Sequence, residues 1–396
     1  MDRFTYIIVG GGTAGANAVD GIRAHDTKGS IALFGRENHL PYDRPPLSKG
    51  LWLGKTTEEQ LPVHDASFYE SSGVQLHLGA TIDRVMPKER EVVDEGGRAY
   101  RYDKLLIATG GHARPLQFGE GIVAYLRTVD DYHSLLKASG PSRTVVVIGG
   151  GFIGCEISAS LTQKGMHVTM IFPETDILSH MLPADLAAHV TGYYRSKGVT
   201  IESGDIPVSL QLGPDAINVA TREHKGILGD LVVGAVGLAL DTRIAASAGL
   251  AIGNGIIVDS HLQTSEPFIF AAGDVAMFPS HALGRNVRVE HWDNARAQGF
   301  LAGENMAGAK KPYDYLPYFY SDLFDLGFEA VGDISSRLEV YADWKDKFRE
   351  GVLYYLDQGL VKGVLLWNVW EKVPQARALV EQKTKVMYPS ELSGRI

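Results

Sequence analysis

The chain contains 396 residues, more than the roughly 100–200 of one ordinary domain, so its length predicts two or three domains, of which we expect three. Apolar residues make up 45% and charged residues 21% of the sequence, which is the composition of a globular protein with large cores and excludes a largely disordered chain. The formal net charge of −9 disfavours nucleic acid and anionic membrane as partners, and the single cysteine, Cys155, excludes an intramolecular disulfide and a CxxC redox pair.

Targeting segments and membrane spans are not predicted. The sequence has no run of about 18 apolar residues, and its first predicted strand starts within a few residues of Met1. This leaves no room for a signal or transit peptide, so we expect a cytoplasmic protein with no membrane partner. We also predict no metal site.

The chain begins with a predicted strand, glycine turn and helix. Residues 4–9 are apolar or β-branched at nearly every position, as in a parallel strand covered on both faces. The motif Gly10-x-Gly12-x-x-Gly15 follows at once, and a helix and a strand over 30–34 complete a βαβ unit. In such a unit the first glycine permits a tight turn, the second lets the backbone approach a pyrophosphate, and the third allows close helix–sheet packing.

An acidic residue about 20 positions further on is expected to bind a ribose of the nucleotide, and Glu37 fits this role. Its neighbour Arg36 either reaches the adenine face or a phosphate, or is a solvated loop charge.

The same strand–glycine turn–helix pattern recurs later in the chain. An apolar strand over 143–148 leads into the glycine-rich turn 149–154, a helix, and another strand over 167–172. Two strand–glycine–helix units in one chain predict two separate nucleotide sites.

Two acidic residues accompany the second unit. Glu174 follows the second strand, where a carboxylate accepts hydrogen bonds from an unphosphorylated ribose and repels a 2′-phosphate, which favours NADH over NADPH. The alternative for Glu174 is an exposed loop carboxylate. Glu156 lies in the first turn of the helix, where an acid complements the helix dipole whatever else it does.

The loop over residues 41–49 places two cations beside a rigid Pro-Pro step. Arg44 could grip a pyrophosphate with its planar guanidinium, and Lys49 could present a compact charge to a flavin or to a carboxylate such as Glu156. The alternative is a basic surface loop.

Two similar apolar strands, over 102–111 and 229–237, indicate where the chain leaves the first domain, near residue 114, and returns to it, near residue 238. After about Tyr315 the pattern becomes alternating and β-rich.

The C-terminal part predicts a hairpin of residues 351–356 and 362–367 about a Gln358-Gly359 turn, then a helix over 373–381 and a frayed tail.

Asp274 follows an apolar strand over 268–270, at the end where ligands bind in doubly wound sheets, and could bond the ribityl hydroxyls of a flavin. The stretch 288–295 is expected to start a helix that runs to about residue 305, with its N-terminus placed to stabilise negative charge on a reduced flavin. His291 at its start is, on its own, more typical of a satisfied, partly buried histidine.

Cys155 lies inside the second glycine turn, where a small buried packing residue is expected rather than a reactive thiol. The aromatic stretch over 313–320 is, before any resemblance, more typical of core or interface than of a cofactor contact.

These residues carry a resemblance that covers nearly the whole chain. The sequence is similar to the apoptosis-inducing factor family, and its glycine motifs and RPPLSK loop also resemble the wider group that includes ferredoxin reductases. The stretches that carry it are GGGTAGANA, YDRPPLSKGLW, LLIATGG, GGGFIGCE, IFPE, AAGDVA, VEHWDNA, LAGENMAGAKKPY, YSDLFDLGFEAVGD and GVLLWNVWEKVPQAR.

The resemblance implies an α/β, glutathione-reductase-like fold with two Rossmann-like dinucleotide-binding domains. Residues 1–114 and 238–314 would form a discontinuous FAD domain, residues 115–237 an inserted NADH domain, and residues 315–396 a C-terminal α+β domain.

The resemblance also implies roles for individual residues. Lys49, Glu156, Phe152 and His291 would act at the reacting rings, with Phe152 as an aromatic gate and Lys49 paired with Glu156 beside flavin N5. The FAD positions would be Gly10, Gly12, Thr13, Ala14, Gly15, Glu37, Arg44, Lys49, Val85, Thr109, Gly110, Arg127, Asp274, Glu290, His291 and Tyr320. The NADH positions would be Gly149, Gly151, Phe152, Ile153, Gly154, Glu156, Glu174 and Gly237, and Glu290 also falls on one of them.

The sequence departs from the family in three respects. Tyr320 replaces a tryptophan near the rings, Trp292 replaces a histidine, and the C-terminal insertion of the animal proteins is missing because Arg337 to Arg349 runs almost directly into Gly351. The family's DNA binding and cell-death roles are therefore not expected here.

The function implied is transfer of hydride from NADH to flavin N5, a reduced flavin–NAD charge-transfer pair, and homodimerisation on reduction. The electron acceptor would be a quinone or a small redox protein. Two alternatives are an NADH-dependent reductase of ferredoxin or rubredoxin and a redox-sensing interaction protein whose dimerisation NADH controls.

Overall fold

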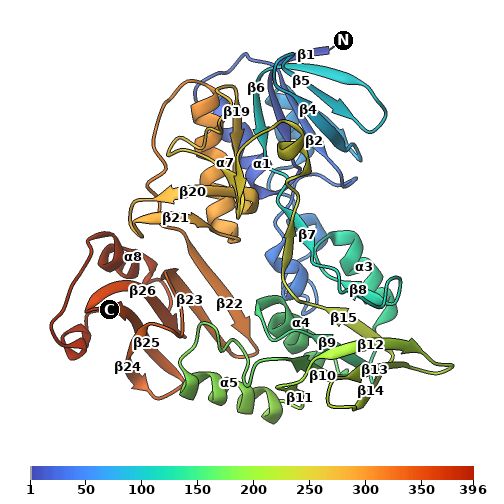
Figure 1. Ribbon diagram of the computed structural model, residues 1–396, viewed down its shortest axis with the longest axis vertical. Coiled ribbons are helices and arrows are strands. Elements are labelled where there is room, and N and C mark those ends of the chain that lie inside the picture. Colours follow the sequence, from blue (N-terminus) through green and yellow to red (C-terminus); the bar gives the residue numbers. More distant parts are fainter. Residues whose placement is uncertain (1) are drawn as a thin grey trace. The chain divides into compact units, whose positions relative to one another are not determined.

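The computed structural model describes residues 2–396. The chain is an α/β protein that forms two compact units, and it passes between them several times (Figure 1). The first unit comprises the chain up to Asp43 with Glu58–His112 and Leu240–Tyr318, and the second comprises Arg44–Thr57, Ala113–Ala239 and Phe319–Ile396.

The first unit is built on a seven-stranded sheet in the order β3-β2-β1-β6-β5-β4, with β19 also paired to β6. The strands β3, β2, β1, β6 and β19 run parallel, and β4 and β5 are antiparallel. β2, β19 and the C-terminal ends of β1 and β6 are apolar and buried, as is typical of parallel strands covered on both faces. The strands are β1 (Asp2–Val9), β2 (Ile31–Gly35), β3 (Val74–Leu78), β4 (Ile82–Met86), β5 (Glu91–Asp94), β6 (Ala99–Ile107) and β19 (Ile269–Ala271).

Two helices of the first unit pack backbone against backbone. They are α1 (Thr13–Arg23) and α7 (Trp292–Met306), which confirms both predicted helices. A Cβ atom on Gly299 would lie 2.2 Å from the carbonyl oxygen of Ala14, and one on Gly303 would make a similarly close approach. Only glycine allows two helix backbones to approach this closely, so these glycines allow α7 to pack directly against α1.

A four-stranded sheet in the order β17-β18-β20-β21 and several short elements complete the first unit. These elements are η2 (Glu58–Gln60), α2 (Ala66–Ser71), α6 (Arg243–Ser247), β17 (Ile252–Gly253), β18 (Gly255–Ile257), η3 (Gly273–Val275), β20 (Ala276–Ser280) and β21 (Arg285–Arg288). Strands β7 (Gly111–Ala113) and β16 (Leu238–Leu240) form a two-stranded sheet of their own.

The second unit contains a five-stranded parallel sheet in the order β11-β10-β9-β15-β8 and a three-stranded antiparallel sheet in the order β12-β13-β14. Its elements up to this point are η1 (Pro45–Ser48), β8 (Val123–Tyr125), α3 (Val129–Ala138), β9 (Thr144–Ile148), α4 (Phe152–Gln163), β10 (His167–Phe172), α5 (Ala184–Ser196), β11 (Thr200–Ser203), β12 (Pro207–Leu212), β13 (Ile217–Thr221), β14 (Gly226–Gly229) and β15 (Leu231–Gly234).

A second five-stranded sheet lies in the C-terminal part, in the order β22-β23-β26-β25-β24. The predicted hairpin is confirmed, since β25 and β26 pair antiparallel about Gln358 and Gly359, both of which have positive φ. The elements are β22 (Tyr318–Leu323), β23 (Leu326–Gly332), β24 (Glu339–Asp346), β25 (Glu350–Asp357), β26 (Leu360–Trp367), α8 (Val373–Glu381) and η4 (Pro389–Leu392).

The expectation of a frayed tail is wrong. Leu392 is fully buried, and Ser393 Oγ and Gly394 N donate hydrogen bonds to the carboxylate of Asp343. An apolar anchor and a paired backbone are enough to order the last residues.

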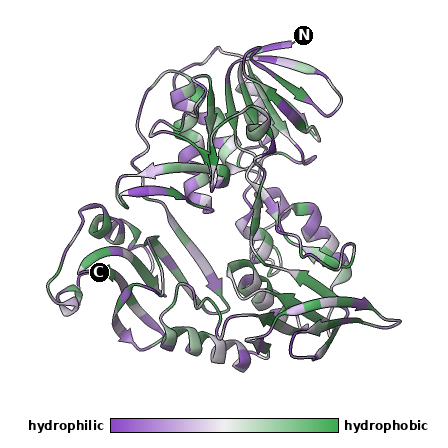
Figure 2. Ribbon diagram, viewed as in Figure 1, coloured by the Kyte–Doolittle hydropathy of each residue, from purple (hydrophilic) through white to green (hydrophobic). Residues whose placement is uncertain are grey.

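The strands of the sheets are mostly hydrophobic, and the helices beside them mix hydrophobic and hydrophilic residues (Figure 2). Within residues 2–396, no helix has the length and apolar character that crossing a membrane requires. The three-domain division stays a prediction, because the second unit contains both the inserted segment and the C-terminal sheet.

Candidate coenzyme sites

In the first glycine turn, Gly12 is a position where the surrounding protein would leave room for a larger residue. Gly10 has φ +130, and a Cβ there would lie 2.1 Å from the oxygen of Ala108, while a Cβ on Gly15 would lie 2.0 Å from the oxygen of Gly10. Gly12, in contrast, has no atom within 4 Å of its added Cβ, and as N-cap of α1 it provides no side-chain cap. The open space at an uncapped helix start, where N–H groups point outward, fits a phosphate.

The second glycine turn repeats this arrangement. A Cβ on Gly149 (φ +127) would lie 2.3 Å from the oxygen of Ala235, and a Cβ on Gly154 would lie 2.1 Å from the oxygen of Gly149. Gly151 is the uncapped N-cap of α4, and nothing lies within 4 Å of its added Cβ. Both turns thus keep a glycine where only a close ligand would need one.

An unpredicted residue, Asp241, organises the residues near Glu37. Arg36 donates to its Oδ2 at 2.5 Å, Thr109 Oγ1 donates to its backbone oxygen at 2.7 Å, and its N–H donates to Gly110 O at 3.0 Å. Burial works to raise the pKa of Asp241, but Arg36 and Arg243 outweigh it and lower that pKa. Arg36 is therefore paired with a buried carboxylate, while its own side chain is 55% exposed.

Glu37 itself accepts a hydrogen bond from Tyr42 Oη at 2.5 Å. Tyr42 therefore holds the carboxylate of Glu37, the predicted ribose ligand, from within the same loop.

Trp292 has a defined partner in the first unit. Its Nε1 donates to Asp43 Oδ1 at 2.6 Å, and Thr13 Oγ1 donates to the same oxygen at 2.9 Å. The indole N–H therefore ties the start of α7 to the start of α1 through one carboxylate.

His291 is the N-cap of α7, and Glu290 before it pairs with Arg288 at 2.7 Å. Burial lowers the pKa of His291 to about 4, although Asp274 acts in the opposite direction, so the imidazole is neutral at neutral pH. Asp274 lies in η3, and its carbonyl oxygen accepts from Arg288 Nη1 at 3.2 Å.

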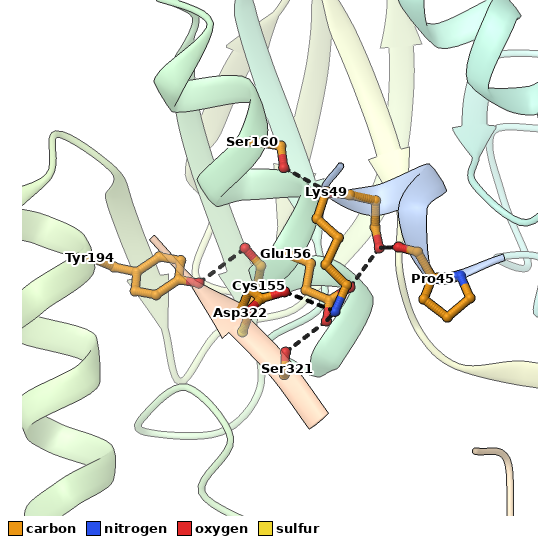
Figure 3. Close-up of polar contacts among 9 residues, drawn as sticks. Pro45, Lys49, Cys155, Glu156, Ser160, Tyr194, Ser321 and Asp322 are labelled. Atoms are coloured by element: carbon orange, nitrogen blue, oxygen red, sulfur yellow. Dashed lines mark hydrogen bonds and ion pairs between the residues drawn. The ribbon is translucent and has the colours of Figure 1, made fainter. Parts of the chain in front are cut away.

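The second unit contains a compact ion-pair cluster, shown in Figure 3. Lys49 Nζ lies 3.2 Å from Glu156 Oε1, as predicted for this pair, and 3.2 Å from Asp322 Oδ2. The ring centroid of Tyr320 lies 4.0 Å from the same ammonium. Burial works to lower the pKa of Lys49, and Glu156, Tyr320 and Asp322 together raise it above the ordinary lysine value.

Two hydroxyl groups complete the contacts of Glu156. Ser48 Oγ donates to its Oε2 at 2.5 Å and Ser321 Oγ donates to its Oε1 at 2.8 Å. Three donors thus satisfy a buried carboxylate. The prediction that Glu156 lies in the first turn of its helix is wrong, because α4 begins at Phe152 and has no acidic residue in its first turn.

Ser48, Ser321 and Asp322 were not among the predicted residues. Ser321 and Asp322 directly follow Tyr320, and Ser48 precedes Lys49. Their position next to predicted site residues is the sequence signal that could have identified them.

Phe152 and Ile153 are exposed large apolar residues in the first turn of α4. The Phe152 ring meets the ring of Phe319 edge to face, with centroids 5.6 Å apart. An exposed aromatic beside a glycine turn could cover a flat ring.

The ribose carboxylate expected after β10 also has a partner. His180 Nε2 lies 2.8 Å from Glu174 Oε1, and the backbone of His180 accepts from Ser336 N at 3.0 Å. Gly237, at the end of the same sheet, has φ +99 and accepts from Arg114 N.

The other predicted residues are distributed between the units. Arg44 Nη1 donates to the backbone oxygen of Arg127 at 2.6 Å in the second unit, and Val85 N donates to Ser247 Oγ at 3.5 Å in the first. The assignment of particular residues to a coenzyme stays a prediction.

Cys155 is fully buried, and burial raises the pKa of its thiol, with Glu156 adding to the shift. The prediction of a packing residue is confirmed. Within residues 2–396 there is no group of three or more His, Cys, Asp or Glu side chains that could hold a metal ion.

Known families and proteins match nearly the whole chain. Residues 4–299 match the family described as pyridine nucleotide-disulphide oxidoreductase, and residues 302–345 and 339–382 match the C-terminal region of mitochondrion-associated apoptosis-inducing factor.

Two curated relatives illustrate the similarity. Apoptosis-inducing factor 1, mitochondrial, of Dictyostelium discoideum is 33% identical over 100% of this chain and 82% of its own length. Putidaredoxin reductase of Pseudomonas putida is 33% identical over 82% of this chain and 79% of its own. Among solved structures, the putidaredoxin reductase–putidaredoxin complex superposes with a TM-score of 0.92 at 31% identity, over 99% of this chain and 95% of that one.

Proposed function

The chain belongs to the pyridine nucleotide-disulphide oxidoreductase family, and from that premise we propose that it oxidises NADH with a bound FAD and passes the electrons to a separate acceptor. It is an oxidoreductase that uses FAD and NAD(H). The observation that carries the proposal is the second glycine of each glycine motif, Gly12 and Gly151. Each lies at a helix start without a side-chain cap, and no other part of the described chain lies within 4 Å of a Cβ added to it.

The chemistry divides between coenzyme and protein. FAD, when bound, supplies the ring system that takes up a hydride. In our proposal the start of α1 would hold its pyrophosphate, and the start of α4 would hold that of NADH. Glu174 would accept hydrogen bonds from the adenosine ribose of NADH and repel the 2′-phosphate of NADPH.

The protein's other contribution is a fixed positive charge. Lys49 stays protonated between Glu156 and Asp322, so its ammonium can stabilise negative charge that develops nearby. Phe152 would shield the nicotinamide side from water until NADH enters.

The acceptor cannot be reached through a protein dithiol, because Cys155 is the single cysteine and is buried. We propose a small iron–sulfur protein as acceptor. Relatives are named ferredoxin, rubredoxin and putidaredoxin reductases, and this supports the choice.

The test is anaerobic mixing of the purified holoprotein with NADH, followed by a panel of acceptors. We expect flavin absorbance to bleach, with a broad long-wavelength band if NAD⁺ stays bound. Turnover with ferredoxins or rubredoxins should exceed turnover with quinones or ferricyanide. Flavin that stays oxidised under excess NADH would refute the proposal, and faster turnover with quinones would refute the choice of acceptor.

A further inference from the structure

Lys49 is shared between two carboxylates of different character. The Glu156 side chain is 6% exposed and the Asp322 side chain 51%, and each places an oxygen 3.2 Å from the ammonium. The Lys49 side chain is itself 13% exposed. One side of the ammonium therefore faces a buried anion and the other a partly solvated anion.

The buried anion does not depend on Lys49 alone. Ser48 and Ser321 donate to its two oxygens, so two hydroxyl bonds would remain if the ammonium moved away. A lysine side chain has four rotatable methylene groups, and a single buried counter-ion fixes its direction poorly. Asp322 provides a second contact to the ammonium, from a direction different from that of Glu156.

The second carboxylate comes from the strand that also supplies the aromatic contact. Tyr320 and Asp322 are two positions apart on β22, so they point to the same side of the strand, and both contact the ammonium. Ser321 between them contacts Glu156 (Figure 3). Three consecutive residues of one strand thus enclose the ion pair.

A cavity of about 270 Å³ reaches this cluster, with Lys49, Tyr320, Asp322 and Lys55 among its lining residues. Water in this cavity could solvate the ammonium and draw it away from Glu156. Asp322 stands in the cavity wall, where it can oppose that movement.

We propose that Asp322 is a positioning residue that holds the Lys49 ammonium beside Glu156 against the cavity. The groups that contact this ammonium are Glu156 from α4 and Tyr320 and Asp322 from β22, and Lys55 is a further charged residue that lines the cavity. The consequence for reaction with NADH rests on the proposed function, but the effect on Lys49 itself does not.

The direction of the effect follows from charge. Removing the Asp322 charge takes away an anion that favours protonated Lys49, while burial still favours the neutral form. The pKa of Lys49 should therefore fall, by about 1 unit for loss of one nearby carboxylate.

The experiment compares Asp322→Asn with Asp322→Glu and with Asp325→Asn. Asp325 pairs with Lys197 at 2.9 Å and Arg349 at 3.2 Å, so its change removes a neighbouring charge with different partners. Competitive acetylation of the holoproteins across a pH series, read by mass spectrometry of the peptide that contains Lys49, gives the pKa of this one lysine.

We expect Asp322→Asn to lower that pKa, Asp322→Glu to restore most of it, and Asp325→Asn to leave it unchanged. The alkaline limb of the NADH reduction rate should move with it. An unaltered Lys49 pKa in Asp322→Asn, or an equal fall in Asp325→Asn, would overturn the proposal. If the wild-type flavin is not reduced by NADH at all, the proposed function fails, and the acetylation result still decides the role of Asp322.

Discussion

The enclosed imidazole of His291 makes a residue-scale prediction about pH. Its pKa is about 4 in the folded protein, below the value of about 6.5 in an unfolded chain, so the unfolded state binds more protons between these values. Stability should therefore be lost as the pH falls from about 6.5 towards 4. The loss from this group between pH 7 and pH 5 is on the order of 2 kcal/mol.

The measurement is the urea unfolding free energy of the FAD-loaded protein at pH 7 and pH 5. His291→Gln, which cannot titrate, should show a smaller difference between the two pH values than wild type. The same difference in both proteins would mean that His291 is protonated in the folded state.

The buried carboxylate of Glu156 makes a second residue-scale prediction. Glu156→Leu leaves two serine hydroxyls facing an apolar side chain and leaves Lys49 with Asp322 as its carboxylate partner, so we expect a loss of about 1–3 kcal/mol in the unfolding free energy. The double variant Lys49→Met with Glu156→Leu should recover part of this loss, because the ammonium that has lost its buried partner is gone. A double variant less stable than the single one would show that the pair itself, and not its desolvated charge, dominates.

At the scale of the element, the two glycine turns predict separable losses. Gly12→Ala places a methyl group in the open space at the start of α1, without a clash inside the protein, so the variant should fold and lose FAD affinity at least about tenfold. The flavin content after dialysis measures this. Gly10→Ala is the matched contrast, since its Cβ would lie 2.1 Å from a backbone oxygen, and it should fail through instability instead.

The corresponding change in α4 should affect the other coenzyme. Gly151→Ala should retain FAD and weaken NADH binding, measured as the NADH concentration needed for half-maximal reduction rate. Loss of FAD from Gly151→Ala, with NADH affinity retained, would contradict the assignment of the two turns.

The elements and the glycine turns could be predicted from sequence because their signals are local. The apolar strand over 4–9, the glycines after it and the start of α1 at Thr13 lie within one short stretch. The residues that sequence reasoning missed are those whose partners lie far away. Arg36 and Asp241 are 205 positions apart, and Ser321 and Glu156 are 165 apart, so only the folded chain brings them together.

At the scale of the whole molecule, charge and cysteine content limit how electrons can leave. The net charge of −9 does not favour an acidic electron carrier through the overall field, so binding to such a carrier would depend on a local basic surface. Raising the ionic strength should then slow turnover with an iron–sulfur acceptor but leave reduction by NADH unchanged, measured by steady-state and stopped-flow assays at several salt concentrations. Turnover independent of salt would argue against a charged docking surface.

We infer that one chain holds two dinucleotides on two phosphate-binding turns. The most direct measurement is the FAD released by acid per chain, together with an anaerobic titration of the same sample with NADH. We expect one FAD per chain and complete bleaching of the flavin by one equivalent of NADH. A colourless protein that takes up no FAD on reconstitution would contradict it.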